Sequence, residues 1–358
     1  MGKEINKTVF VGVSGGVDSS VAAALLKDQG YNVVGVFIRT WSPDFIKCTW
    51  KNERRDAMRV CAHLDIPFLE CDAEVAYKKG VADYMIEEYK KGNTPNPDVM
   101  CNRMVKFGVF WQFAKSHGAD FIATGHYTIC KKEKLFFMKQ GVDSSKDQSY
   151  FLWTLTQDDL AHTLFPVGHL EKTEVRKLAE KYKLGTAVKK DSQGVCFLGP
   201  LDMKDFLKHY IEIKKGDVVD ENGKIIGSHD GAIFFTLGER HGFNIFKNED
   251  NSKPLYVVSK NIITNTIVVS SQLNILPTPG VRRNLAICNN INWIGNTPEK
   301  DKKYKAQIRY HGELLECKVV VTGETHVEVI FDKDVLVDKG QSIVVYDGDI
   351  CLGGMVVA

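Results

Sequence analysis

The first 125 residues alternate short apolar runs with longer stretches in which apolar residues recur at helical spacing. The apolar runs lie at 9–13, 33–38, 68–71 and 121–124, and the helical patterns near 21–27, 54–64, 75–90 and 102–117. This alternation predicts βαβ units, in which helices cover both faces of a parallel, Rossmann-type sheet. Binding residues are then expected at the carboxyl ends of the strands.

The rest of the chain changes from helix to short strands near Gly216. Residues 157–209 are mainly helical, with Thr173 placed to cap a helix that ends near 184–185. Residues 217–226 predict a hairpin around Asn222-Gly223. Further β runs lie at 255–258 and 266–269, a plausible linker at 276–280, and strands of a small antiparallel barrel at 305–310, 314–321, 327–331 and 342–346. We therefore expect an α/β catalytic domain over 1–212, a β-rich central domain over 213–276 and a C-terminal β-barrel over 277–358.

Composition narrows the class of protein. The 358 residues are 44% hydrophobic and 26% charged, as in globular proteins, and too many for one core. No apolar run approaches the ~20 residues that cross a bilayer, and residues 1–6 lack the apolar stretch of a signal peptide, so we expect a cytoplasmic protein. Nine cysteines without a Cys-x-x-Cys pair argue against a secreted disulfide framework, a zinc ribbon and a dithiol redox protein. The net charge of +2 does not identify partners.

The most informative motif is Ser-Gly-Gly-Val-Asp-Ser at residues 14–19, between the first apolar run and the first helical pattern. Two glycines allow a sharp turn in which backbone N–H groups and the positive end of a helix face an anion. The lysine of a Gly-x-x-x-x-Gly-Lys-Ser/Thr loop is absent, which argues against transfer of a γ-phosphate. Asp18 could cap the helix or serve a phosphate or Mg²⁺.

Two further loops each carry a cysteine. Residues 92–102 hold two prolines and two asparagines before Cys101, which predicts a defined loop followed by a helix whose positive end would lower the thiol pKa. Asp98 lies three residues before this thiol. In residues 189–199, Cys196 follows Gly194 and the Lys189-Lys190 pair, a setting that would stabilise a thiolate or a persulfide anion.

Together these motifs resemble the tRNA 2-thiouridylases, members of the PP-loop ATP pyrophosphatases. The resemblance runs from Val11 to Val356. It rests on the segments 12–19, 96–102, 124–127, 146–152, 164–168, 191–199, 309–310 and 351–354, in that order. Several independent motifs in one order are far more specific than any one of them.

The resemblance implies that ATP, with Mg²⁺, adenylates O2 of the wobble uridine (position 34) of Glu-, Gln- and Lys-type tRNAs, releasing pyrophosphate. No dedicated metal site on the protein is expected. Cys196 would carry a persulfide from an upstream donor, a cysteine desulfurase or relay protein. Cys101 would act as the nucleophile that helps release the sulfur, leaving a Cys101–Cys196 disulfide. The ATP-binding residues implied are Gly12, Val13, Ser14, Gly15, Gly16, Val17, Asp18, Ser19, Ile38 and Gly125.

A target base must leave its stack, so residues that hold the flipped nucleotide are expected. The positions implied are Asn96, Pro97, Asp98, His126, Lys146, Asp147, Gln148, Arg309, Tyr310 and Gln341. Asp98 could position the base or accept a proton, and the sequence does not separate these roles. Taken alone, 146–148 would be an ordinary charged loop and Arg309-Tyr310 an exposed strand end.

The sequence departs from the family pattern at two places. Ile38 stands where the family usually has Met, a change of similar volume. Glu239 and His241 replace the usual Gln and Lys, which puts a tRNA contact by residues 236–243 in doubt.

Two other functions remain open at this stage. A PP-loop ATPase that adenylates a small-molecule carbonyl would need neither the paired cysteine loops nor a C-terminal barrel. An RNA-binding protein on a degenerate nucleotide fold would not need Asp18, Cys101 and Cys196, all of which are present.

Overall fold

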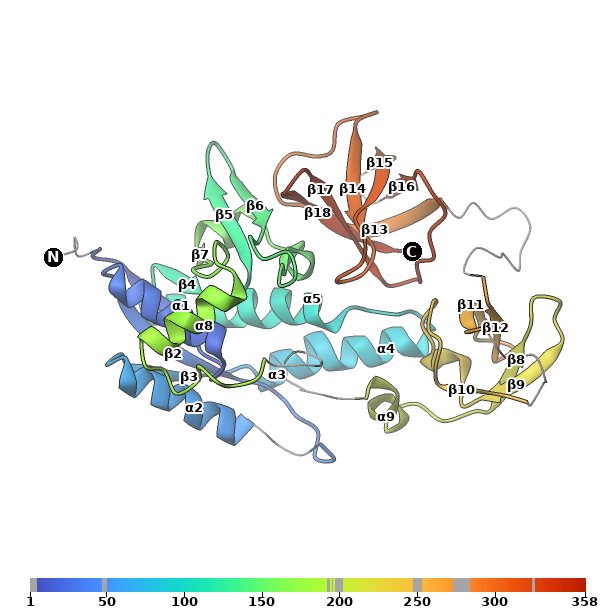
Figure 1. The fold of residues 1–358 in the computed structure, drawn as a ribbon, viewed down its shortest axis with the longest axis horizontal. Coiled ribbons are helices and arrows are strands. Elements are labelled where there is room, and N and C mark those ends of the chain that lie inside the picture. The colour runs from blue at the N-terminus through green and yellow to red at the C-terminus, as the bar shows by residue number, and fades with distance from the viewer. Residues whose placement is uncertain are drawn as a thin grey trace.

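The computed structural model describes residues 5–46, 50–191, 194, 196, 202–246, 253–272, 284–323 and 326–358, and its strands form three sheets (Figure 1). The first sheet is parallel, in the order β3-β2-β1-β4-β7. Its strands are β1 Thr8–Gly12, β2 Asn32–Arg39, β3 Phe68–Asp72, β4 Phe121–Ala123 and β7 Thr163–Leu164. The strand order reverses at β1, so the loops after β1 and β4 meet at the point where such sheets bind ligands. The predicted Rossmann-type sheet is confirmed.

Both faces of this sheet are buried, which explains why β1 is apolar from Val9 to Val11. Val9 and Val11 face a core with α1 (Val17–Asp28), α2 (Trp50–His63) and α8 (Lys172–Lys181), while Phe10 faces a second core. Alternate residues of a strand point to opposite faces, so a strand covered on both faces needs apolar residues throughout.

Two long helical segments cover the second face (Figure 1). One consists of α3 (Glu74–Tyr77), the π-helical η1 (Lys78–Asp83) and α4 (Tyr84–Lys90). The other consists of α5 (Pro97–Cys101), the π-helical η2 (Asn102–Val109) and α6 (Phe110–Ser116). The prediction that 92–102 is entirely a loop is wrong at 97–101. Pro97 fits the first helical turn, and the Asn96 side chain accepts hydrogen bonds from two backbone N–H groups there.

Four shorter helices follow in the described chain: η3 Ser149–Leu152, α7 Gln157–Ala161, α9 Met203–Lys208 and the 3-10 turn η4 Ala232–Phe234. The predicted cap at Thr173 is wrong, because α8 begins one residue earlier, with Glu171 at its N-cap and Glu174 closing a capping box. This helix also ends at Lys181, short of the expected 184–185.

The central sheet has the order β10-β9-β8-β12-β11. Its strands are β8 Gly216–Val219, β9 Ile225–His229, β10 Phe243–Ile245, β11 Tyr256–Asn261 and β12 Thr266–Ser270. The predicted Asn-Gly hairpin joins β8 to β9, with Gly223 at φ +80°.

The C-terminal strands form a six-stranded antiparallel barrel closed by pairing of β13 with β18. The strands are β13 Leu285–Trp293, β14 Lys303–Gln307, β15 Leu315–Val321, β16 Val327–Phe331, β17 Ser342–Asp347 and β18 Ile350–Val357. The predicted barrel is confirmed, although its first and last strands were not recognised. The expected linker at 276–280 lies outside the described residues.

A hairpin from the first domain extends the barrel sheet, which the sequence did not suggest. It consists of β5 (Thr128–Lys132) and β6 (Phe136–Gln140), and β6 pairs with β18 through Met138 and Cys351 (Figure 1). The barrel is therefore joined to the catalytic domain by a shared sheet. Across the described part of the chain, no helix is long and apolar enough to span a membrane.

Candidate active site

The glycine-rich loop leaves the carboxyl end of β1 and enters α1 at Gly16. Ser19 closes the turn, because its hydroxyl accepts from the Ser14 N–H at 3.3 Å and donates to the Gly16 carbonyl at 3.3 Å. Gly15 has φ +73°, and a Cβ there would lie 2.7 Å from the Glu53 carbonyl oxygen on α2. Glycine is thus required both by backbone conformation and by contact with a neighbouring helix.

The other residues predicted to bind ATP shape this edge of the sheet. Val13 and Val17 are buried and anchor the loop, and Ile38 is buried beside Gly12. Gly125, after β4, packs so closely on the start of α1 that an added Cβ would lie 2.7 Å from the Ser19 nitrogen. The loops after β1 and β4 are therefore in direct contact.

Asp18 lies in the first turn of α1 and is not its cap. Its carboxylate accepts hydrogen bonds from the Tyr127 hydroxyl at 2.7 Å and from the Lys172 ammonium at 2.7 and 2.8 Å. Lys172, on α8, also forms an ion pair with Asp191 at 2.9 Å. Motif reasoning missed Lys172, because 154 positions separate it from Asp18 in the chain.

The two cysteine loops meet. Cys101 Sγ lies 3.4 Å from Cys196 Sγ, a hydrogen-bonding distance that is longer than the ~2.05 Å of a disulfide. The Cys196 backbone is held on both sides, since its N–H donates to Asp98 at 2.8 Å and its carbonyl accepts from the Tyr77 hydroxyl at 2.7 Å. Cys101 is fully buried, whereas Cys196 is partly exposed.

The two thiols differ in acidity. The hydrogen bond from Cys101 and the nearby Lys106 ammonium hold the pKa of Cys196 below its ordinary value, against the effect of burial. Burial, and the role of donor to Cys196, raise the pKa of Cys101 well above the ordinary value. Within the pair, Cys196 is therefore the more acidic thiol and Cys101 the less acidic one. The predicted lowering of the Cys101 pKa by a helix end is wrong, because Cys101 lies inside a continuous helical segment.

Lys106, rather than the Lys189-Lys190 pair, is the cation beside Cys196. Lys189 instead bonds the Gly15 carbonyl at 3.0 Å and Asp56 at 2.8 Å, and Lys190 is exposed. Burial lowers the pKa of Lys106, but the neighbouring acidic groups, Cys196 first among them, outweigh it and raise that pKa above its ordinary value. The predicted electropositive setting of Cys196 is therefore present, but from another source.

A π-helical turn explains how Lys106 reaches the thiols. Lys106 lies five positions after Cys101, and side chains at that spacing point to different faces of a regular α-helix. In η2 the i→i+5 pattern widens the turn and brings the side chains closer to one face. Helical periodicity could not have indicated this.

His126 is buried next to the same lysine. Its Nε2 lies 3.3 Å from the Lys106 ammonium and its Nδ1 lies 2.8 Å from the Thr124 hydroxyl. Burial, with the neighbouring Lys106 charge, holds the pKa of His126 well below its ordinary value. The imidazole is thus neutral, with Nε2 accepting from Lys106.

Asn96, Pro97 and Asp98 form the start of α5, one helical turn before Cys101. Asn96 is used as the helix cap, while burial raises the pKa of Asp98 against the effects of the Cys196 N–H and Lys106. A carboxyl of raised pKa beside two thiols is suited to proton exchange.

Residues 146–148 are engaged inside the protein. Lys146 forms an ion pair with Asp191 at 2.9 Å, and Gln148 accepts the Tyr127 N–H at 3.1 Å. Asp147 is buried and accepts hydrogen bonds from Gly141 and Ser149. This segment leads into η3, which packs against the barrel.

The barrel contributes Arg309, Tyr310 and Gln341. Tyr310 follows β14 and lies 4.3 Å from the Phe151 ring, centroid to centroid. Burial, with the charges of Asp147 and Asp98, raises its pKa to about 12. Arg309 is exposed, and the Gln341 side chain accepts the Asp338 N–H at 2.9 Å. Tyr310 thus packs the barrel against η3.

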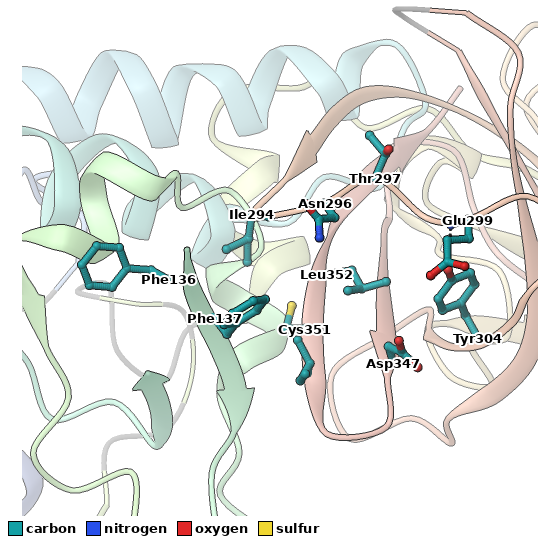
Figure 2. A pocket seen from close by; sticks show the side chains of 12 residues that line it. Phe136, Phe137, Ile294, Asn296, Thr297, Glu299, Tyr304, Asp347, Cys351 and Leu352 are labelled. Carbon is teal, nitrogen blue, oxygen red and sulfur yellow. Dashed lines mark hydrogen bonds between the residues drawn. The ribbon is translucent and has the colours of Figure 1, made fainter. Parts of the chain in front are cut away.

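Glu239, at the second of the two departures from the family pattern, is used within the central domain, where it accepts the Thr236 N–H at 3.0 Å. A cavity of about 140 Å³ lies elsewhere, between the β5–β6 hairpin and the barrel, lined by Phe137, Ile294 and Cys351 among others (Figure 2). The predicted site residues are not among the residues that line it. No cluster of three or more metal-ligating side chains occurs within the described ranges.

Comparisons with known proteins agree with this architecture. Residues 7–200 match a family model described as tRNA methyl transferase HUP domain, 204–271 one described as tRNA methyl transferase PRC-barrel domain, and 283–357 one described as Aminomethyltransferase beta-barrel domain. The fold and the paired thiols define a HUP-domain enzyme with a two-cysteine site.

The chain belongs to the tRNA-specific 2-thiouridylase (MnmA) family. It is 41% identical to the tRNA-specific 2-thiouridylase MnmA of Bacillus subtilis (strain 168) over 352 residues, 97% of this chain and 93% of the relative. It is 42% identical, with the same coverage, to the protein of that name from Oceanobacillus iheyensis. A solved U34-tRNA thiolase NcsA of Methanococcus maripaludis is 18% identical with a TM-score of 0.36, covering 57% of this chain and 63% of its own.

Proposed function

We propose that this protein transfers sulfur to C2 of the wobble uridine of tRNA, with ATP adenylating O2 and AMP and pyrophosphate released. The observation that carries the proposal is the pair of thiols 3.4 Å apart, the buried Cys101 with a raised pKa and the partly exposed Cys196 with a lowered pKa. Family membership supports the same chemistry.

We further propose that the substrates are Glu-, Gln- and Lys-type tRNAs and that the protein is cytoplasmic. The proposed domain limits are 1–212, 213–276 and 277–358.

The exposure of the thiols supports Cys196 as the sulfur carrier. A donor protein can reach only a thiol at the surface, and Cys101 is fully buried. The thiolate is the nucleophilic form, and Lys106 stabilises it at Cys196. Cys196 attacks the terminal sulfur of the donor persulfide, which displaces the donor thiolate and leaves Cys196 carrying that sulfur.

Cys101 then releases the sulfur. Deprotonated Cys101 attacks Cys196 Sγ, the bond from Cys196 Sγ to the terminal sulfur breaks, and its electron pair leaves with that sulfur. The sulfur forms a bond to C2 of the adenylated uridine, where AMP is the leaving group. A Cys101–Cys196 disulfide remains and is reduced by an external thiol. Asp98 is positioned either to accept the Cys101 proton or to orient the base.

ATP would lie on residues 12–19, with Ile38 and Gly125 at the neighbouring strand ends. Asp18 is a single carboxylate already bonded to Lys172, so this edge fits Mg²⁺ brought with the phosphates rather than a resident metal. Mg²⁺ would neutralise phosphate charge. Lys172 supplies the cation that the loop itself lacks.

The tRNA would lie over the start of α5 and the barrel. Asn96, Pro97, Asp98 and His126 are proposed to hold the flipped uridine, and Lys146, Asp147, Gln148, Arg309, Tyr310 and Gln341 to contact the tRNA around it. The approach of Tyr310 to the η3 segment supports this, since an aromatic ring there is suited to stacking on a base.

Incubation with tRNA, ATP, Mg²⁺ and a persulfide source, followed by mass spectrometry of the nucleosides, tests the proposal. We expect 2-thiouridine together with equal amounts of AMP and pyrophosphate. ADP and phosphate as first products would contradict the adenylation step. AMP formed with a small molecule but never with tRNA would instead support the alternative function, adenylation of a small-molecule carbonyl.

A further inference from the structure

Segment 92–94 lies in the first domain, just before α5, and both other domains contact it. The central domain contacts it through Ile262, whose side chain lies 2.5 Å from where a Cβ on Gly92 would be. The barrel contacts it through the Lys339 carbonyl, which accepts the Thr94 N–H at 2.6 Å. Gly340 has φ +85°, and a Cβ there would lie 3.0 Å from the Asn93 Cβ and 3.1 Å from the Thr94 backbone.

One carboxylate oxygen lies at the centre of this junction. Asp338 Oδ2 accepts hydrogen bonds from the Thr94 hydroxyl at 2.7 Å and the Lys260 ammonium at 2.6 Å. It also accepts the Leu237 N–H at 3.4 Å. The donors belong to the catalytic and central domains, and the acceptor belongs to the barrel. Lys260 additionally bonds the Phe235 carbonyl at 2.8 Å.

The ion pair is unusually well shielded. The side chains of Lys260 and Asp338 are 7% and 4% exposed, the lowest values of any ion pair in the described chain. Removing two charges from water costs free energy that packed apolar side chains would not incur. What such a pair supplies, and apolar residues do not, is a directional arrangement of the groups around it.

We propose that Asp338 is a positioning residue that, with Lys260, clamps Thr94 and thereby sets the position of the Asn96–Cys101 turn. The same residue orients the proposed tRNA contact Gln341, whose side chain accepts the Asp338 N–H. The junction thus couples the surface proposed to bind tRNA to α5, the helix that carries Asp98 and Cys101. The inference rests on the proposed function for the roles of those two residues.

Thr94→Val tests the clamp, because it removes the hydroxyl while leaving the Lys260–Asp338 pair intact. Two rates are measured well below the melting temperature: closure of the Cys101–Cys196 disulfide under limiting diamide without tRNA, and thiolation of tRNA. We expect disulfide closure and kcat to fall by roughly 10-fold, because small displacements of reacting groups are costly. KM for tRNA should change little, and Thr94→Ser should restore both rates.

Asn292→Ala is the matched control. Asn292 also joins the barrel to the catalytic domain, by hydrogen bonds to the Trp153 and Leu155 carbonyls at 2.7 and 2.9 Å, but it does not contact 92–94. Its disulfide closure should match the wild type. Gly340→Ala perturbs segment 92–94 from the barrel side. It is the second test variant, used if Thr94→Val does not fold.

Wild-type closure rates in Thr94→Val or Gly340→Ala would overturn the proposal, as would equal slowing in Asn292→Ala. Disulfide closure needs neither tRNA nor ATP. If the wild type made no 2-thiouridine, the proposed function would fail while the closure rates still decided whether the junction positions Cys101.

Discussion

At the scale of single residues, the site depends on the unequal acidity of two thiols. Burial raises the pKa of Cys101, while the hydrogen bond that Cys101 donates and the nearby Lys106 lower the pKa of Cys196. The more exposed thiol is therefore ready to accept sulfur, while the buried thiol stays unreactive until a base removes its proton.

Replacing Lys106 with Met should raise the pKa of Cys196, because the thiolate loses a neighbouring positive charge. Loss of a neighbouring opposite charge shifts a pKa by about 1–3 units, so alkylation of Cys196 near neutral pH should slow by at least roughly 10-fold. The measurement is the rate of iodoacetamide labelling of Cys196 against pH, by peptide mass spectrometry. Reactivity rises with pH through the thiol pKa, so the profile should move to higher pH.

Lys106→Arg is the control for this prediction. It keeps the positive charge, so its profile should remain near that of the wild type. An unchanged profile in Lys106→Met would show that Cys101 alone stabilises the thiolate.

Asp18→Ala should abolish formation of AMP while leaving tRNA affinity nearly intact. The carboxylate is held beside the glycine-rich loop by Tyr127 and Lys172, far in sequence from the proposed tRNA contacts. Lys172 keeps Asp191 as its partner, so the variant should fold. AMP release and tRNA binding are measured in parallel, and normal AMP release would remove Asp18 from the nucleotide site.

At the scale of elements, the site is assembled where the loops after β1 and β4 touch. Gly125→Ala should lower ATP affinity, because its Cβ would lie 2.7 Å from the Ser19 nitrogen and displace the loop. Gly185→Ala is the matched control, since a Cβ at Gly185 meets no atom within 4 Å. Calorimetric titration with ATP compares them, and equal affinities would mean that the loop tolerates this displacement.

The elements also show what the sequence could predict. Apolar runs such as 9–13 predicted the parallel sheet because burial on both faces leaves a clear pattern, and the motif at 14–19 identified the glycine-rich loop that follows the first run. Lys106 was missed because a π-helical turn breaks the 3.6-residue period on which helical reasoning depends. Lys189 was placed beside Cys196 on sequence proximity, yet its side chain turns back to Gly15.

At the scale of the whole molecule, the catalytic domain and barrel share a sheet through β6 and β18, and all three domains meet at Thr94. Neither contact could be predicted from local patterns. The hairpin at 128–140 looks like any short β run, and the ion pair joins residues 78 positions apart. Several motifs in one order indicated the family, but long-range contacts set the geometry.

Transfer of sulfur from Cys196 to tRNA is tested most directly by a single turnover with sulfur-35 persulfide loaded on the protein. Labelled protein is mixed with tRNA, ATP and Mg²⁺ without reductant, and labelled 2-thiouridine and the Cys101–Cys196 disulfide are quantified over time. We expect the label to start on Cys196 and thiouridine and disulfide to appear in equal amounts at one rate, with neither formed by Cys101→Ala. Stable label on Cys101, or thiouridine formed without the disulfide, would contradict it.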